Sequence, residues 1–283
     1  MKLYALSDLH VNHAANRETL EAMPAHPQDW LILAGDLGES PDQLAWVFDT
    51  LAPRWARLLW VPGNHELWTP RDGPAGVAKY DALVQLCRSR GVVTPEDPYP
   101  RWPDQPDVRI CPLFLLYDYS FCPPGMSPAE AIAWARDDGI QCADELYLRA
   151  DPYPDRGSWC RARVAATEAR LSALPTSERT VLISHWPLRL DLVRLYRIPR
   201  FIPWCGTVLT HDWHLRFRAI AAVSGHLHMR ATDWRDGVRF EEVSLGYPRH
   251  WRPECGAAGY LREVLPGAPE PGPMQSGGPV WHR

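Results

Sequence analysis

Five short motifs in the chain place carboxylate, amide and imidazole side chains next to one another. They are SDLH at 7–10, GD at 35–36, GNHE at 63–66, SHWP at 184–187 and GHLH at 225–228. Oxygen and imidazole ligands without thiolate suit Mn, Fe, Zn, Ni or Co better than Ca or Mg alone. The motifs therefore indicate a site for one or more of these metal ions.

The spacing inside two of the motifs suggests how they bind. Asp8 and His10 are two residues apart, and so are His226 and His228. On an extended strand end, side chains at i and i+2 point the same way, so each pair is expected to face one metal ion. If the backbone turns at GHLH, its two histidines would instead face adjacent ions. Two ions about 3.5–4 Å apart form a clamp for phosphoryl transfer.

Each motif follows an apolar segment that predicts a buried strand. Such segments, including one without a motif, lie at 2–7, 30–35, 57–63, 108–119, 179–187 and 218–230, and two alternating segments follow at 237–246 and 259–265. Amphipathic spacing predicts helices over 40–52, 78–91 and 158–174, with Ser40 and Ser158 as caps of the first and last. Alternating strands and helices are typical of a layered α/β fold, in which ligands bind at the carboxyl ends of strands.

Two segments interrupt this alternation. Residues 120–157 are rich in Pro, Asp and aromatic side chains, and we interpret them as an insertion that serves either as a lid over the site or as a dimer surface. Residues 266–283 are rich in Pro and Gly and are expected to be disordered. The expected organisation is one domain over 1–265 followed by this tail.

The composition argues against several classes of protein. The formal net charge of −4 at pH 7 gives no sign of a basic surface for nucleic acid or an anionic membrane. No apolar run approaches the roughly 20 residues of a transmembrane helix, and the N-terminal segment turns polar too early for a signal peptide. The 7 cysteines are scattered without a C-x-x-C pair. This pattern predicts a reduced, cytoplasmic protein in which most cysteines are core residues, and it argues against zinc held by cysteine.

Taken in order, the five motifs resemble the pattern of the calcineurin-like metallophosphoesterase superfamily. That pattern is D-x-H, G-D, G-N-H-[DE], a lone His and G-H-x-H, and residues 1–230 of this chain follow it. The resemblance implies a four-layer α/β/β/α sandwich of two mixed β-sheets flanked by helices. The alternating segments 237–246 and 259–265 are expected to be exposed-edge strands at the end of the second sheet.

The resemblance also implies a role for each matching residue. One metal ion would be held by Asp8, His10 and His228. A second would be held by Asn64, His185 and His226, with Asp36 bridging the two. His65 would bind no metal but would stabilise the phosphate charge and protonate the leaving group. The implied cofactors are two divalent ions, Mn²⁺ first, with Fe, Zn, Ni or Co as alternatives, and the implied attack is by metal-bound hydroxide without a phosphoenzyme.

Departures from branch-specific patterns narrow the function. The stretch GDLGES lacks the Asp and Arg of the protein-phosphatase motif G-D-x-x-D-R-G, and Glu39 stands where purple acid phosphatases have tyrosine. His65 is retained, whereas lipid-A precursor hydrolases have arginine there. Both histidines of GHLH are present, as in phosphodiesterase branches. The negative net charge and the inserted Trp- and Pro-rich segments, which could enclose a small ligand, add to this pattern. We therefore expect hydrolysis of a small soluble phosphate ester, with a diester ahead of a monoester.

Two other functions remain open at this point. A nuclease or RNA-end-processing enzyme would fit the same motifs, although the absence of a basic excess argues against it. A non-catalytic scaffold would keep the fold, but such relatives lose ligands, and all the motif positions are retained here. The sequence does not predict the oligomeric state.

Three further side chains have open roles. His13 is a candidate for the substrate pocket and equally for a surface loop, and Arg200 is a candidate anion-binding residue or part of a solvated helix face. Glu66 would either orient a ligand histidine or serve as a turn carboxylate.

Overall fold

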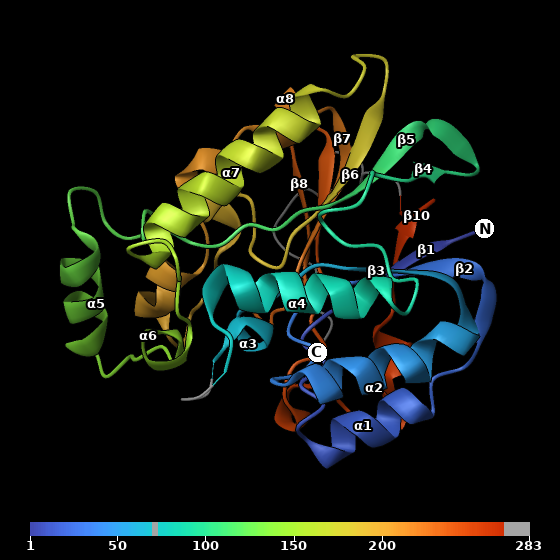
Figure 1. Ribbon diagram of the computed structural model, residues 1–283, viewed down its shortest axis with the longest axis horizontal. Helices are drawn as coiled ribbons and strands as arrows, with labels where there is room; N and C mark the ends of the chain where they lie inside the picture. The colour runs from blue at the N-terminus through green and yellow to red at the C-terminus, as the bar shows by residue number, and fades with distance from the viewer. Residues whose placement is uncertain (70–72, 269–283) are drawn as a thin grey trace, which may run out of the picture.

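The computed structural model describes residues 1–69 and 73–268 and contains two packed β-sheets (Figure 1). The first sheet has the strand order β10-β1-β2-β3. Its strands β1, β2 and β3 are parallel, and β10 pairs antiparallel with β1. Their bounds are β1 Leu3–Leu6, β2 His26–Leu33, β3 Trp55–Trp60 and β10 Arg262–Leu265.

The second sheet has six strands in the order β4-β5-β6-β7-β9-β8. Strands β5, β6, β7 and β9 are parallel, whereas β4 and β8 are antiparallel strands at the two edges. Their bounds are β4 Arg101–Trp102, β5 Gln105–Pro112, β6 Arg179–Ile183, β7 Ala219–Ser224, β8 Thr232–Arg235 and β9 Val238–Glu242.

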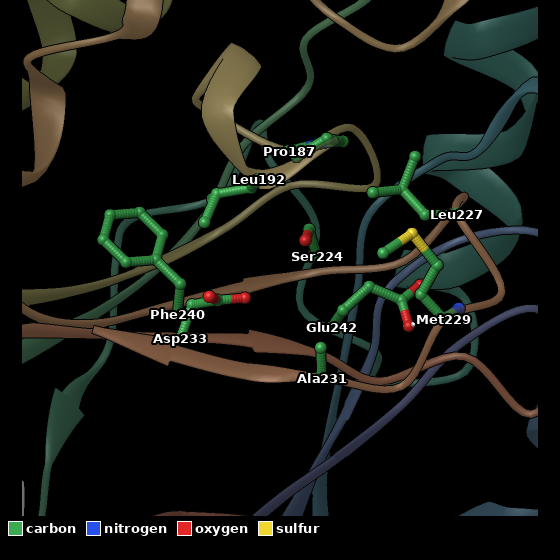
Figure 2. Close-up of a pocket in the computed structure, with 9 residues that line it drawn as sticks. All are labelled: Pro187, Leu192, Ser224, Leu227, Met229, Ala231, Asp233, Phe240 and Glu242. Atoms are coloured by element: carbon green, nitrogen blue, oxygen red, sulfur yellow. Dashed lines mark hydrogen bonds between the residues drawn. The ribbon is translucent and has the colours of Figure 1, made fainter. Parts of the chain in front are cut away.

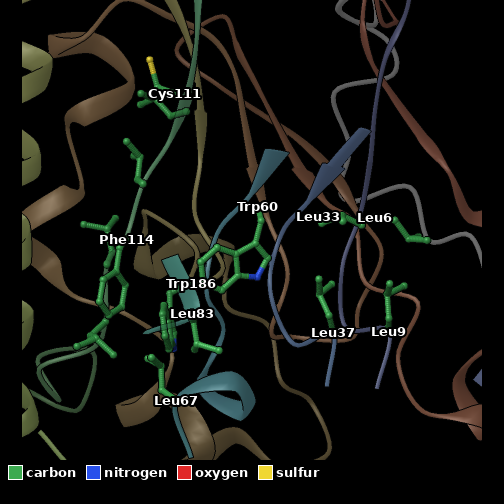
Figure 3. Packing of buried hydrophobic residues seen from close by; sticks show 14 of the residues in the cluster. Leu6, Leu9, Leu33, Leu37, Trp60, Leu67, Leu83, Cys111, Phe114 and Trp186 are labelled. Carbon is green, nitrogen blue, oxygen red and sulfur yellow. The ribbon is translucent and has the colours of Figure 1, made fainter. Parts of the chain in front are cut away.

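Alternating side chains of each strand build two different cores. In β1, Leu3 and Ala5 belong to an apolar cluster that also contains Val181 and Ile183 of the second sheet, so this cluster joins the two sheets. Leu6 lies on the other face and belongs to a cluster shared with the helices, part of which is shown in Figure 3. This alternation follows from the two-residue period of a strand.

Helices cover the outer faces of both sheets (Figure 1). Beside the first sheet lie α1 Ala14–Glu21, α2 Pro41–Leu51 and α4 Gly76–Arg88. Beside the second lie α7 Arg156–Ser172 and α8 Trp213–Arg216. The predicted four-layer α/β/β/α sandwich is thus confirmed.

Two predicted helix caps have different outcomes. The Ser40 hydroxyl accepts a hydrogen bond from the Gln43 backbone N–H at 3.2 Å, as expected for the cap of α2. The prediction of Ser158 as the cap of α7 was wrong. The carboxylate of Asp155 accepts from the Ser158 N–H at 2.6 Å, so the helix begins earlier, at Arg156.

The two C-terminal strands do not lie where the alternating pattern placed them. Strand β9 is buried between β7 and β8, and β10 belongs to the first sheet rather than the second. The alternation in β9 reflects a buried ion pair, because Arg239 Nε lies 3.0 Å from Glu241 Oε1 and both side chains are almost inaccessible. A polar residue in this strand therefore indicates an internal partner rather than contact with solvent.

Segment 120–157 contains two short helices, α5 Pro128–Arg136 and α6 Asp144–Tyr147. In Figure 1 both lie at one side of the sandwich, away from β4 and β10. Most of the tail predicted over 266–283 lies outside the described residues.

The cysteines match their expected role as core residues. All are free thiols, and all except Cys255 are buried. Among the described residues, no helix has the length and apolar character needed to cross a membrane.

Candidate metal centre

The five motifs lie in loops at the carboxyl ends of β1, β2, β3, β6 and β7. Backbone hydrogen bonds hold neighbouring loops together: Asp8 N–H donates to Gly35 O at 2.9 Å, and His10 N–H donates to Asp36 O at 3.0 Å. Ser7 forms a parallel bridge with Ser244, which follows β9 of the second sheet. The loops of both sheets therefore meet at one place.

The motif side chains form three overlapping groups. Within each group, one possible ligand atom from every residue lies within 4.8 Å of the others. The groups are Asp8, His10 and His228; His10, Asp36 and His65; and Asp36, His185 and His226. Asn64 adjoins the third group, because its Oδ1 lies 3.3 Å from His185 Nε2. The structure thus brings all the predicted ligands together.

The protonation states of two histidines fit metal binding. Burial lowers the pKa of both His10 and His226 to about 3, so each ring is neutral near pH 7. His10 Nε2 lies 3.2 Å from His228 Nε2, and His226 Nδ1 lies 3.2 Å from His185 Nε2, so these ring nitrogens face the other candidate ligands. Neutral imidazoles with free lone pairs are the form that binds a divalent ion.

The carboxylates give the centre its negative charge. Burial opposes ionisation of Asp8 and Asp36, but nearby histidines outweigh it and lower both pKa values. In turn, the charge of Asp36 overcomes the effect of burial and raises the pKa of His185 to about 10. The centre therefore favours a positive charge beside Asp36, which a metal ion would also supply.

Five of the predicted ligands have a left-handed backbone. Their φ angles are 53° for Asp8, 40° for His10, 54° for Asp36, 72° for His226 and 51° for His228. The expectation that Asp8 and His10 lie on an extended strand end was therefore wrong, and for GHLH the alternative of a turned backbone is the one observed. The backbone turns at GHLH, and its two histidines belong to different groups. Such positive φ values are uncommon outside glycine and tend to occur at functional sites.

Two motif glycines are required by the close approach of a neighbouring loop. Gly63 has a φ of −97°, so it needs no left-handed freedom. A Cβ atom there would overlap Oδ1 of Asp36, and a Cβ at Gly225 would overlap Oδ2 of Asp8. Each of these two glycines leaves room for a carboxylate from another motif.

His65 lies beside Asp36 at the edge of the centre. Its backbone N–H donates to Asp36 Oδ1 at 2.9 Å, and its Nε2 lies 3.8 Å from Asp36 Oδ2. Its Nδ1 lies 3.3 Å from Glu39 Oε1. Burial favours the neutral ring, but Asp36 and Glu39 outweigh this effect and raise the pKa of His65. An imidazole that holds a proton near neutral pH can act as a general acid.

Comparisons with known proteins agree with this geometry. The model of the calcineurin-like phosphoesterase family matches residues 1–230. This chain belongs to that family. The predicted metal-dependent phosphoesterase is thereby confirmed, and the family's centre of two divalent ions has clustered candidate ligands here.

Two comparisons point to the same relative within the family. Acyl-carrier-protein phosphodiesterase PptH from Mycobacterium tuberculosis is 49% identical over 270 residues, which cover 93% of this chain and 83% of that protein. The crystal structure of phosphopantetheinyl hydrolase (PptH) from Mycobacterium tuberculosis superimposes with a TM-score of 0.89 at 48% identity. That superposition covers 95% of this chain and 98% of the other.

Glu66 of the family motif joins two loops through its carboxylate. Its Oε2 accepts from the Asp36 N–H at 3.0 Å and the Gly63 N–H at 2.9 Å, and its Oε1 accepts from the Leu37 N–H at 2.6 Å. Of the two roles left open by the sequence, the turn carboxylate is the one observed. Glu66 thus holds the backbone that carries Asp36.

Several residues around the centre were not identified from the sequence. Tyr247 stacks on His10 with 4.5 Å between ring centroids, and His250 Nδ1 lies 3.1 Å from His228 Nδ1. Both residues follow β9 and carry no motif. Glu39 was noted only as a departure from other branches, although its spacing from Asp36 marked it as a member of the same loop.

The two candidate substrate residues lie in different surroundings. His13 packs against Tyr247, with 5.6 Å between ring centroids, and lines an open hollow with Tyr247, Pro248 and Arg249. The guanidinium of Arg200 instead donates to the Trp134 backbone O on α5 at 2.7 Å. The position of Arg200 therefore gives no support to its predicted role in substrate binding.

A second hollow lies behind the loop that carries GHLH. Figure 2 shows Leu227 and Met229 of this loop beside Glu242 of β9. The cavity volume of about 10 Å³ is space for about one water molecule. This cavity is too small to hold a phosphate ester.

Proposed function

We propose that this enzyme hydrolyses the phosphodiester that joins a phosphopantetheine arm to an acyl-carrier protein. The observation that carries the proposal is the 49% identity to acyl-carrier-protein phosphodiesterase PptH over 93% of the chain. The preference for a diester agrees with our expectation from the sequence. The expected small soluble substrate is revised to an ester carried on a protein.

The groups of side chains support the following ligand assignment. Asp8, His10 and His228 would hold one ion; Asn64, His185 and His226 would hold the other; and Asp36 would bridge them. Asp36 shares one group with His10 of the first ion and another with His185 and His226 of the second, in keeping with that role. The groups combine oxygen and imidazole ligands without cysteine, which suits Mn, Fe, Zn, Ni or Co, and Mn²⁺ is our first choice among these. When bound there, the two ions would neutralise phosphate oxygens and make a water molecule more acidic.

His65 is the proposed general acid. In the reaction, water adds to phosphorus, the ester P–O bond breaks, and the leaving alkoxide takes a proton. Nε2 of His65 is the ring nitrogen nearer Asp36, while Nδ1 faces Glu39. This orientation supports proton donation from Nε2, while the Glu39 carboxylate at Nδ1 stabilises the positive charge of the protonated ring.

Exposed apolar side chains beside His65 support a large substrate. The Trp68 ring lies 3.7 Å from the His65 ring and 5.6 Å from the Tyr147 ring. Tyr147 is 46% exposed, and its neighbour Leu146 is 77% exposed. Apolar side chains exposed together beside a reactive centre often mark a binding surface.

We also place the enzyme in the cytoplasm, consistent with free thiols at all cysteines.

The test uses a carrier protein that bears the phosphopantetheine arm. Incubation with the Mn²⁺-loaded enzyme should release the arm, seen by mass spectrometry as loss of its mass from the carrier. His65→Ala should lower kcat by about 10²–10⁴-fold, the range for general acid catalysis, with both ions retained. Activity on bis-(p-nitrophenyl) phosphate without release of the arm from the carrier would contradict the proposed substrate. Salt-sensitive cleavage of oligonucleotides would favour the nuclease, and inactivity on every ester would favour the scaffold.

A further inference from the structure

We infer that Asp144 of α6 positions the amide of Asn64 in the metal centre. Asp144 is fully buried, and its carboxylate accepts three hydrogen bonds. The donors are Asn64 Nδ2 at 2.9 Å, Trp68 Nε1 at 2.6 Å and the Tyr117 hydroxyl at 3.0 Å. This residue lies in segment 120–157, far from every family motif in the sequence.

The contact with Asp144 determines which way the Asn64 amide faces. Oδ1 of Asp144 accepts from Trp68 Nε1, which can only donate, so this oxygen is an acceptor and selects the NH₂ end of the amide. The Oδ1 end is then directed to the other side, where it lies 3.3 Å from His185 Nε2. If the amide were reversed, two hydrogen-bond donors would face the ion. Asp144 thus selects the orientation in which Asn64 can be a metal ligand.

The same carboxylate oxygen also restrains the aromatic neighbour of His65. Oδ1 of Asp144 accepts from Trp68 Nε1, and the Trp68 ring packs 3.7 Å from the His65 ring. A single buried carboxylate therefore supports both the ligand Asn64 and the ring beside the proposed acid. Without this carboxylate, both buried donors would lack an acceptor.

Helix α6 is itself anchored by the next residue. Glu145 accepts from the Tyr119 hydroxyl at 2.8 Å, from Trp204 Nε1 at 2.8 Å and from the Arg156 guanidinium at 2.9 Å. Adjacent carboxylates thus attach α6 both to the metal centre and to the surrounding core. These contacts place α6 as a wall of the centre.

Glu145 provides a matched control for Asp144, because each carboxylate accepts from three donors and only Asp144 touches Asn64. The inference rests on the proposed role of Asn64 as a ligand. The number of metal ions bound per protein molecule is measured by elemental mass spectrometry at limiting Mn²⁺. Asp144→Ala should lose one of the two ions, whereas Glu145→Ala should keep both.

Each outcome separates the inference from the proposed function. If the wild-type protein binds no ion, the proposed centre is wrong. If it binds two ions, equal metal content in the two variants overturns the role of Asp144.

A pair of conservative changes tests the contact even where Asp144→Ala does not fold. Asn64→Asp places two carboxylates against each other, so adding Asp144→Asn should raise the thermal unfolding midpoint of that variant. In the wild-type background, Asp144→Asn should leave the midpoint unchanged or lower it. The same shift in both backgrounds would overturn the inference.

Discussion

At the scale of single residues, the contact between Glu39 and His65 distinguishes this imidazole from the predicted ligands. The other histidines of the centre face one another or Asp8 and Asp36, whereas His65 Nδ1 lies 3.3 Å from a carboxylate that is partly exposed. The negative charge stabilises the protonated ring, which is the form a general acid needs. Glu39 is therefore expected to set the pH range of the enzyme.

We expect Glu39→Gln to move the basic limb of the kcat–pH profile to lower pH. Glu39 raises the pKa of His65, so its loss lowers that pKa and the acid loses its proton earlier as pH rises. The shift should be several tenths of a unit, because an exposed ion pair contributes about 0.2–1 kcal/mol and one unit corresponds to about 1.4 kcal/mol. Metal content serves as the control and should not change. An unmoved limb would show that Glu39 does not tune the acid.

At the scale of elements, the loops that follow the strands are packed closely together. A side chain of one loop leaves room only for glycine in the neighbouring loop. Gly63 precedes α3 Asn64–Leu67, and Asp36 follows β2. Glu66 then ties the two loops through backbone N–H groups on both sides. The metal centre therefore depends on the separation of two loops as well as on its ligands.

Gly63→Ala should lower both stability and metal affinity. Its Cβ would meet the Asp36 carboxylate and backbone rather than a flexible side chain, and such overpacking costs about 1–3 kcal/mol. Gly157→Ala is the control, because it lies in the first turn of α7 and its nearest neighbour is the flexible Arg161 guanidinium. Urea unfolding and Mn²⁺ titration measure the two effects. Equal behaviour of the two variants would refute the steric argument.

At the scale of the whole molecule, a buried ionic cluster joins the two sheets. Glu241 of β9 lies 3.0 Å from Arg239 in its own strand and 3.3 Å from Arg262 of β10 in the other sheet. Ser7 and Ser244 connect the sheets again beside the metal centre. The relative position of the sheets brings motifs from both into one site.

Glu241→Ala should destabilise the protein by about 3–5 kcal/mol, because it leaves buried arginine charge without its partner. Glu168→Ala is the control, since Glu168 pairs with Arg216 on the surface and exposed pairs contribute about 0.2–1 kcal/mol. The free energies of unfolding come from urea denaturation. A small effect at Glu241 would mean that the cluster does not hold the sheets together.

The sequence alone determined the family, the types of ligand and the order in which they occur. Each motif is local, because a strand and the turn that follows it are encoded within a few residues, as in Asp8 and His10 after β1. The Ser40 cap is local for the same reason. The layered fold followed from the alternation of apolar strands and amphipathic helices.

Only the tertiary structure decided which distant groups support those motifs. Asp144 and His250 lie far from their partners Asn64 and His228 in the chain, so no local spacing marks them. The placement of β10 beside β1 depends on pairing between opposite ends of the chain. Hydrogen bonding and packing act through space, and their partners are set only when both sheets have come together.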